Sequence, residues 1–136
     1  MREDDGATSD LLIELRLPPR AKSIATVRAV AADVTSRADF DLDAISDVRM
    51  AVDEACTALA RLASPTHLMR AVFSLAGGYL RVDISARVQP PDRRIDTGGF
   101  GWHVLGSLAD ELSTEHGVGV HGDEVVIRMA KKSAGG

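Results

Sequence analysis

The hydrophobic residues at the start of the chain follow two different spacings, and each spacing predicts one element. Residues 11–17 alternate between apolar and mostly polar side chains, which predicts a half-buried strand that Pro18 and Pro19 end. In residues 24–34 the apolar positions lie three or four residues apart, which predicts a helix that ends at a turn near residues 37–40.

The strongest periodic pattern lies in a second predicted helix, between Asp41 and the pair Ser64-Pro65. Asp41 is a suitable N-cap, and Asp43 lies in the first turn, where a negative charge favours the helix dipole. Ser64-Pro65 ends the helix because the residue before a proline avoids the helical conformation. One continuous apolar stripe is predicted along this helix: Leu42, Ile45, Val48, Val52, Ala55, Leu59 and Leu62.

The second half of the chain predicts two hairpins separated by a loop and a helix. Apolar residues with a period of two flank a pair of glycines, which predicts a hairpin over residues 71–86. Residues 90–97 are polar and contain prolines, which favours a loop, and residues 102–112 carry a helical pattern. A Gly-rich turn predicts a closing hairpin over residues 112–129.

The element order β-α-α-β-β-α-β-β predicts an α+β fold, a two-layer sandwich in which helices cover one face of a mainly antiparallel sheet. A chain of 136 residues has room for one such domain. We assign it to residues 11–130 and expect a disordered tail at residues 1–10 and a flexible tail at residues 131–136.

Composition narrows the function and the location. The net charge of -4 and the pI near 5.5 give no electrostatic signature for binding nucleic acid or an anionic membrane. No apolar run approaches the ~20 residues of a membrane-spanning helix, and the acidic N-terminus is unlike a secretory signal. The lone cysteine, Cys56, is expected to be a small buried residue in a reducing compartment. We therefore expect a cytoplasmic protein.

A glycine-rich turn at the start of the third predicted helix is the first candidate site. Gly98, Gly99, Phe100 and Gly101 would let backbone N–H groups approach an anion, and the helix dipole would favour phosphate there. His103 is a candidate to line the same pocket. The alternative is that these glycines only form a tight turn.

Glu54 is the second candidate, because it lies on the long helix away from the apolar stripe. Its carboxylate could serve as a general base; the alternative is an ordinary solvated charge. A metal site is not expected, since none of the histidines has ligand spacing with Cys56 or with a carboxylate cluster: His67, His103, His116 and His121.

Together these stretches resemble the bacterial anti-sigma factor serine kinases, the RsbW and SpoIIAB type, within the GHKL superfamily. Residues 14–18 and 23–28 resemble the opening strand and first helix of that family. Residues 47–57, with the run Glu-Ala-Cys-Thr, are similar to its N-box helix. Residues 98–112 are similar to its second glycine box and the following helix. The resemblance covers about residues 12–129.

The resemblance implies a nucleotide site and a set of protein partners. It implies a Bergerat-type pocket for ATP with Mg²⁺, and a homodimer that holds a sigma factor. In the kinase members it also implies phosphorylation of a serine on an anti-anti-sigma protein of the STAS type, which releases the sigma factor.

The chain departs from the family pattern inside the nucleotide boxes. Glu54 matches the family's general base, but Ala58 stands where an asparagine holds Mg²⁺, and a methyl group cannot bind this cation. Ala86 and Val88 stand where the family has the Asp and the Gly of its first glycine box, so the hydrogen bond to adenine is lost. The segment that covers the nucleotide is short, at residues 89–97. We therefore expect ATP binding to be weak or lost and Mg²⁺ binding to be doubtful.

Three functional hypotheses follow. The first is an anti-sigma factor that binds by protein–protein contacts and has weak or no kinase activity. The second is an active serine kinase that uses substitute residues such as Arg87 or Asp92. The third is a pseudo-kinase scaffold whose partner is not a sigma factor.

The resemblance places partner binding on the first helix and its flanks. Arg20, Lys22 and Arg28 cluster there, beside a strand whose outer edge is available to a second protomer. Arg28 lies next to the apolar stripe, where its guanidinium group is expected to be held rigid against acidic groups of a partner. The alternative is that all three are solubilising charges.

Overall fold

The elements follow the predicted order and form one layer of helices on one sheet. The structure is a computed structural model that describes residues 11–133, so the predicted N-terminal tail and residues 134–136 lie outside the described residues. The elements are β1 (Leu11–Leu17), α1 (Ala21–Arg37), α2 (Leu42–Leu62), β2 (Met69–Ala76), β3 (Tyr79–Arg87), α3 (Phe100–Leu108), β4 (Glu111–Val118) and β5 (Glu124–Lys132).

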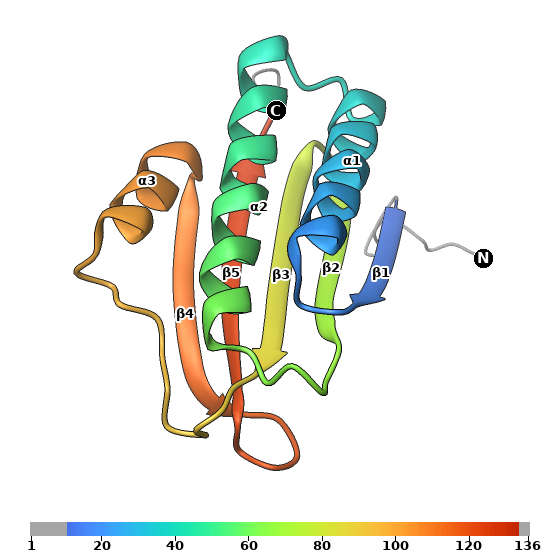
Figure 1. Cartoon of the computed structure of the whole chain (residues 1–136). Coiled ribbons are helices and arrows are strands. Elements are labelled where there is room, and N and C mark those ends of the chain that lie inside the picture. The colour runs from blue at the N-terminus through green and yellow to red at the C-terminus, as the bar shows by residue number, and fades with distance from the viewer. Residues whose placement is uncertain (1–10, 134–136) are drawn as a thin grey trace.

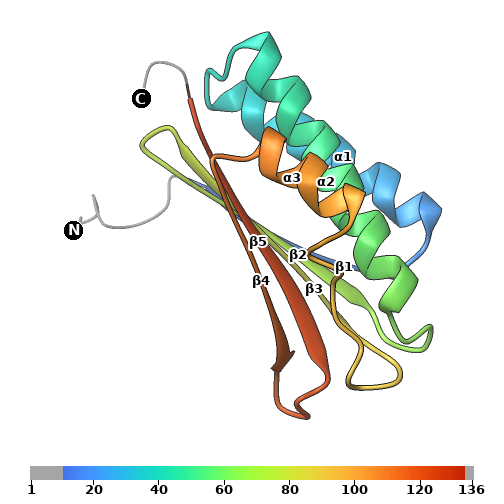
Figure 2. The same ribbon diagram turned by 90° about the vertical axis from the view of Figure 1, so that its left-hand side faces the viewer.

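The sheet has the strand order β1-β2-β3-β5-β4, and every neighbouring pair is antiparallel. Figure 1 shows the helices in front of the sheet, and the turned view in Figure 2 shows all of them on the same face. The predicted α+β two-layer sandwich is confirmed. No helix within residues 11–133 is long and apolar enough to cross a membrane.

The helix α2 packs along the middle of the sheet, as its periodicity predicts. The carboxylate of Asp41 accepts a hydrogen bond from the Ala44 N–H at 2.8 Å, which confirms Asp41 as the N-cap. The predicted apolar stripe is wrong at its first member, because Leu42 is 83% exposed. Ala44 begins the buried face of α2, and Leu42, two residues earlier, lies on a different face of the helix.

Cys56 is a buried residue of α2, as predicted. Burial, with a smaller contribution from the charge of Asp53, raises the pKa of the Cys56 thiol to about 12. The thiolate is therefore scarce at neutral pH, and Cys56 acts as a packing residue.

The predicted extents of the last helix and the last strand are both corrected. The helix α3 ends at Leu108, not at residue 112, because Ala109 adopts an extended conformation and Leu112 pairs with Met129 in the sheet. The strand β5 continues to Lys132, beyond the predicted domain end at residue 130. The helix gives way because β4 pairs with β5 from Glu111 onward, and β5 extends because Lys131 and Lys132 pair with Leu80 and Tyr79 of β3. Both pairings satisfy backbone groups that a longer helix or a tail would leave without partners.

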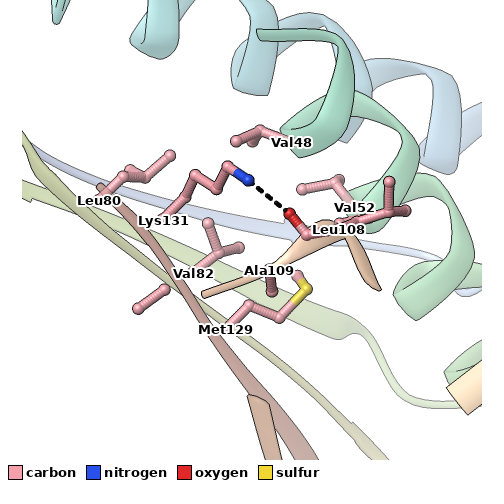
Figure 3. A pocket seen from close by; sticks show the side chains of 10 residues that line it. Val48, Val52, Leu80, Val82, Leu108, Ala109, Met129 and Lys131 are labelled. Carbon is pink, nitrogen blue, oxygen red and sulfur yellow. Dashed lines mark hydrogen bonds between the residues drawn. The ribbon is translucent and has the colours of Figure 1, made fainter. Parts of the chain in front are cut away.

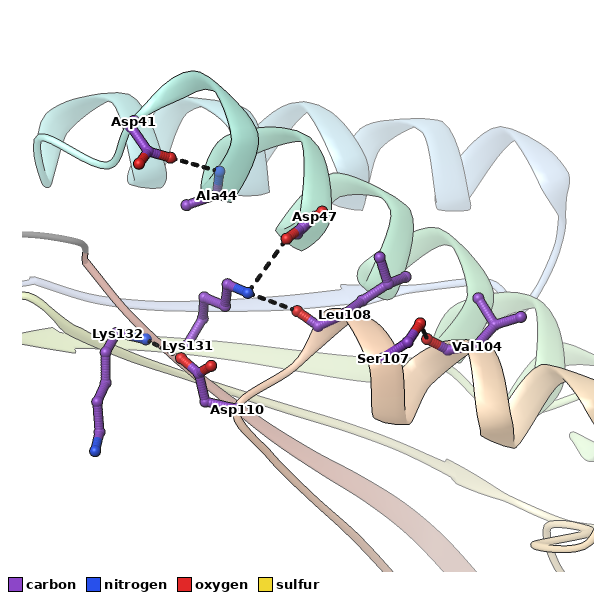
Figure 4. Close-up of polar contacts among 9 residues, drawn as sticks. All are labelled: Asp41, Ala44, Asp47, Val104, Ser107, Leu108, Asp110, Lys131 and Lys132. Carbon is purple, nitrogen blue, oxygen red and sulfur yellow. Dashed lines mark hydrogen bonds and ion pairs between the residues drawn. The ribbon is translucent and has the colours of Figure 1, made fainter.

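Lys131 fastens the end of α3 to the rest of the fold. Its ammonium group donates a hydrogen bond to the Leu108 carbonyl at 2.9 Å and forms an ion pair with Asp47 of α2 at 3.3 Å (Figure 4). A cation at a helix C-terminus also complements the helix dipole. One side chain of β5 therefore joins α2 and α3.

The stem of Lys131 passes through an apolar space between these elements. Figure 3 shows Val48, Val52, Leu80 and Met129 around it. The cavity there measures only about 10 Å³, which is at the lower limit for a single water molecule, so it is not a ligand site. The Lys131 side chain is 18% exposed, so its polar contacts lie largely out of solvent.

Replacing Lys131→Met tests this connection, because methionine keeps the apolar stem and removes the ammonium group. The Leu108 carbonyl and the Asp47 carboxylate would each lose a partner, so we expect the free energy of unfolding to fall by about 1–2 kcal/mol, as measured by urea denaturation. Lys132→Met is the matched control, since the Lys132 side chain is exposed. Its effect should stay within about 0.5 kcal/mol, and equal effects of the two substitutions would contradict the proposed connection.

Candidate functional site

A cleft of about 510 Å³ lies between α2, α3 and the segment that precedes α3. Figure 2 shows α3 beside α2, and Figure 1 shows the preceding segment rising to the start of α3. The lining residues come from α2 (Glu54, Ala58, Arg61 and Leu62), from the preceding segment (Arg94, Ile95, Asp96 and Gly99) and from α3 (Phe100, Gly101, Trp102 and Leu105). The two candidate features of the sequence therefore line one cleft.

Glu54 and Gly101 approach each other closely at the centre of this cleft. A Cβ atom on Gly101 would lie 2.6 Å from Oε2 of Glu54 and 3.4 Å from its Cδ. Glycine at position 101 thus leaves the room in which the half-buried Glu54 carboxylate meets the first turn of α3. This contact places a candidate general base beside a candidate anion-binding turn.

Asp96 builds the turn that leads into α3. Its carboxylate accepts a hydrogen bond from the Gly98 N–H at 3.0 Å, and its carbonyl accepts one from the Gly99 N–H at 3.1 Å. A Cβ on Gly99 would lie 3.0 Å from Oδ2 of Asp96, so a side chain there would crowd the Asp96 carboxylate. Asp96 was not among the residues predicted from the sequence. Its signal was an aspartate two residues before a glycine pair, which is typical of an Asx-turn.

The start of α3 has open backbone donors. Gly99 is the N-cap residue and provides no side-chain cap. The first N–H groups of a helix have no intrahelical partner, and the residues that carry them here, Phe100, Gly101 and Trp102, line the cleft, so this turn is suited to an anion. Phe100 stands at the mouth of the cleft and is 84% exposed. Gly98 and His103 are exposed and do not line the cleft.

The three positions at which the chain departs from the family pattern have two kinds of environment. Ala58 lines the cleft one helical turn after Glu54. Ala86 and Val88 do not line it; both are buried in the hydrophobic core, where Ala86 pairs with Val125 and Val88 forms a bridge with Ala63. Here β3 and its continuation pair as ordinary strand, so a glycine is not needed at position 88.

The two substitute residues considered above lie away from the cleft. Arg87 donates hydrogen bonds to one oxygen of Asp123 from Nε at 2.9 Å and from Nη2 at 2.8 Å. This guanidinium group holds the pKa of Asp123 below its usual range. Asp92 is exposed and, like Arg87, is not a lining residue. Neither residue can replace the missing ligands in this conformation.

The three basic residues near the start of the chain have different environments. Arg20 and Lys22 are exposed. Nη1 of Arg28 lies 2.8 Å from Oδ1 of Asp53, so α2 holds the guanidinium group against the side of α1. Both side chains of this pair remain more than one third exposed, at 41% and 44%.

A nucleotide fits this site in part. The open turn at Gly99 and Gly101 and the cations Arg61 and Arg94 suit phosphate groups. For a divalent cation the fit is poorer at position 58, where Ala58 offers no oxygen, and the carboxylates in the lining are those of Glu54 and Asp96. Within residues 11–133 no group of three or more His, Cys, Asp or Glu residues could hold a metal ion by itself.

Comparisons with known proteins agree with this geometry. The sequence profile of the histidine kinase-like ATPase domain matches residues 17–131. A Mycobacterium tuberculosis protein named anti-sigma-F factor RsbW is 36% identical over 104 residues, which are 76% of this chain and 61% of that protein. This chain thus spans about three fifths of the length of that relative. A Bacillus cereus protein named serine-protein kinase RsbW is 25% identical, with 79% of both chains covered.

Solved structures support the fold. The crystal structure of the RsbU and RsbW domains of a Mycobacterium tuberculosis protein matches with a TM-score of 0.72 and 17% identity, over 90% of this chain and 32% of that chain. A chain in the crystal structure of the SiaB–SiaC complex from Pseudomonas aeruginosa matches with a TM-score of 0.65 and 10% identity. The match covers 88% of this chain and 88% of that chain. The resemblance inferred from the sequence is therefore confirmed.

The contact between Gly101 and Glu54 can be measured with a double-mutant cycle. In the native background, Gly101→Ala should change the free energy of unfolding by less than about 1 kcal/mol, because the gain in helix propensity is offset by the displacement of Glu54. In a Glu54→Ala background the same substitution should stabilise the protein by about 0.5–1 kcal/mol. Urea denaturation of the four proteins gives the coupling.

Gly106→Ala is the control for this cycle. Gly106 lies in the same helix, and a Cβ there would have no heavy atom within 4 Å. Its effect should be the same in both backgrounds. An equal effect of Gly101→Ala in both backgrounds would show that the two residues are not coupled.

Proposed function

The chain belongs to the histidine kinase-like ATPase domain family, and from that premise we propose that it is an anti-sigma factor. In this role it sequesters an alternative sigma factor and is antagonised by an anti-anti-sigma protein of the STAS type. The similarity that supports this assignment is the 36% identity with the mycobacterial anti-sigma-F factor over 104 residues. A sigma factor as partner also supports a cytoplasmic location.

One observation in the cleft favours binding over catalysis. Glu54 is in place beside Gly101, but Ala58 lines the cleft where a metal ligand would be needed. Losing a charge-assisted contact typically costs about 1.5–3 kcal/mol, which is tenfold or more in affinity. We therefore infer weak binding of ATP with Mg²⁺ and weak or absent phosphoryl transfer. An anti-anti-sigma protein would then have to displace the sigma factor by competing with it for this chain.

The rival proposal is a serine kinase, and the relative named serine-protein kinase RsbW is the reason to test it. Glu54 is the only one of the catalytic groups proposed for a kinase that lines the cleft, since Arg87 and Asp92 do not.

A homodimer also belongs to the anti-sigma factor proposal. It is supported by the outer edge of β1, which has a paired neighbour, β2, on one side only within the described sheet.

Phosphorylation of the cognate anti-anti-sigma protein separates the two proposals. Incubation with ATP and Mg²⁺ should yield little phosphoserine by mass spectrometry, because the cleft lacks a metal ligand at position 58. Glu54→Gln is the control for any signal that appears. Stoichiometric phosphorylation that Glu54→Gln abolishes would establish the kinase and refute the binding-only role.

Partner binding at α1 has its own test. Arg28→Ala should weaken affinity for the purified sigma factor at least tenfold, because a held arginine at an interface centre typically contributes ~2 kcal/mol or more. The loss of an exposed ion pair should change the free energy of unfolding by less than about 1 kcal/mol. Titration calorimetry and urea denaturation measure the two effects.

Arg37→Ala is the matched control on the same helix, since Arg37 forms an exposed ion pair with Asp33 at 2.8 Å. Its removal should leave sigma-factor affinity unchanged. If the two substitutions lower sigma-factor affinity equally, or if Arg28→Ala does not lower it, the binding surface does not include this part of α1. Capture of a different protein from the native host, with no affinity for any sigma factor, would favour the scaffold hypothesis.

A further inference from the structure

Two arginines line the cleft and have no ionic partner among the described residues. Arg61 lies on α2 two turns after Glu54, and Arg94 lies on the segment before α3. Six arginines are paired with carboxylates within 4.0 Å: Arg16, Arg28, Arg37, Arg70, Arg87 and Arg128. Of the described arginines without such a pair, Arg61 and Arg94 are the two that line this cleft.

The carboxylates of the cleft do not neutralise these arginines. Asp96 accepts the hydrogen bond from the Gly98 N–H and shapes the turn, and Glu54 lies against Gly101. No oxygen of either residue lies within ion-pair distance of Arg61 or Arg94 in the described structure. Both guanidinium groups are thus available to a ligand.

We propose that the cleft binds the phosphate groups of a nucleoside di- or triphosphate without a divalent cation, and that Arg61 and Arg94 supply the compensating charge. The inference rests on the proposed function only in that it uses the same cleft. A polyphosphate needs positive charge around it, and position 58 offers a methyl group in place of an oxygen ligand. Guanidinium groups bind phosphate oxygens in a bidentate manner and need no coordination sphere.

The rest of the cleft fits the same ligand. The open N–H groups at the start of α3 add donors for phosphate oxygens, and α3 has nine residues, so its dipole is developed. The volume of about 510 Å³ lies within the ordinary range for small-molecule sites. Ile95, Trp102 and Leu105 form an apolar wall beside the arginines, which suits the nucleoside part.

Titration calorimetry of the whole chain with ATP, in EDTA and in excess Mg²⁺, tests the proposal. Affinity in EDTA should equal or exceed the affinity in Mg²⁺, because the cation shields the phosphates from the arginines. Arg61→Ala and Arg94→Ala should each lower affinity about tenfold or more, the loss of one charge-assisted contact. Arg49→Ala is the control, since Arg49 is an exposed α2 arginine outside this cleft.

Parallel titrations identify the part of the ligand that is bound. Tripolyphosphate should bind and adenosine should not. If ATP binds more tightly than tripolyphosphate, the nucleoside contacts the apolar wall. Thermal melting of each variant checks that its fold is intact.

The inference is overturned if binding requires Mg²⁺ or if the arginine variants bind ATP as the native chain does. Absence of ATP binding in both buffers would also overturn it. Sigma-factor capture is measured without nucleotide, so it stands or fails independently of these outcomes.

Discussion

The packing of α3 against α2 forms the cleft, and Gly101 approaches Glu54 closely where the two helices meet. A side chain at position 101 would meet the end of the Glu54 side chain, so the Glu54 carboxylate could stay beside the first turn of α3 only with glycine there. At the other end of the helix, Lys131 binds the Leu108 carbonyl and Asp47. A short helix with one buried residue, Leu105, has little apolar surface with which to hold itself. The two ends of α3 therefore make contacts of different kinds. The start lies close to Glu54, and the end accepts a hydrogen bond from the ammonium group of Lys131.

This arrangement explains how the cleft can keep its shape with an alanine at position 58. The walls depend on glycines, on Asp96 and on Lys131, none of which is a metal ligand or a general base. The residue at position 58 contributes only a methyl group to the lining and makes none of these contacts. Metal binding and the shape of the cleft are thus separable, and a binding protein can keep one without the other.

The sequence predicted those features that depend on local periodicity. Some signals are carried within a few turns or residues of chain: the N-cap Asp41, the stripe of α2 and the glycine pair of the first hairpin. The N-cap and the hairpin are confirmed, and the stripe is correct except at Leu42. The end of α3 was missed because Leu112 continues a helical spacing, and only its pairing with Met129 decides for a strand. Lys131 was assigned to a tail for a related reason. A charged residue near a terminus is ordinarily solvated, and its partners Asp47 and Leu108 are distant in sequence.

The site was predictable to the extent that its residues are adjacent in sequence. Glu54 and the glycine turn were found separately, and only the fold brings them into contact. The adjacent residues Asp53 and Glu54 face different neighbours, Arg28 on α1 and Gly101 on α3. The residues on the inner side of α2, Val52 and Ala55, are fully buried, so one closely packed helix separates the two surfaces. Coupling between the two sites would require a second arrangement of α2, and that arrangement would disturb these buried contacts. Ligand binding in the cleft and partner binding at α1 should therefore be nearly independent, which is consistent with an antagonist that acts by competition.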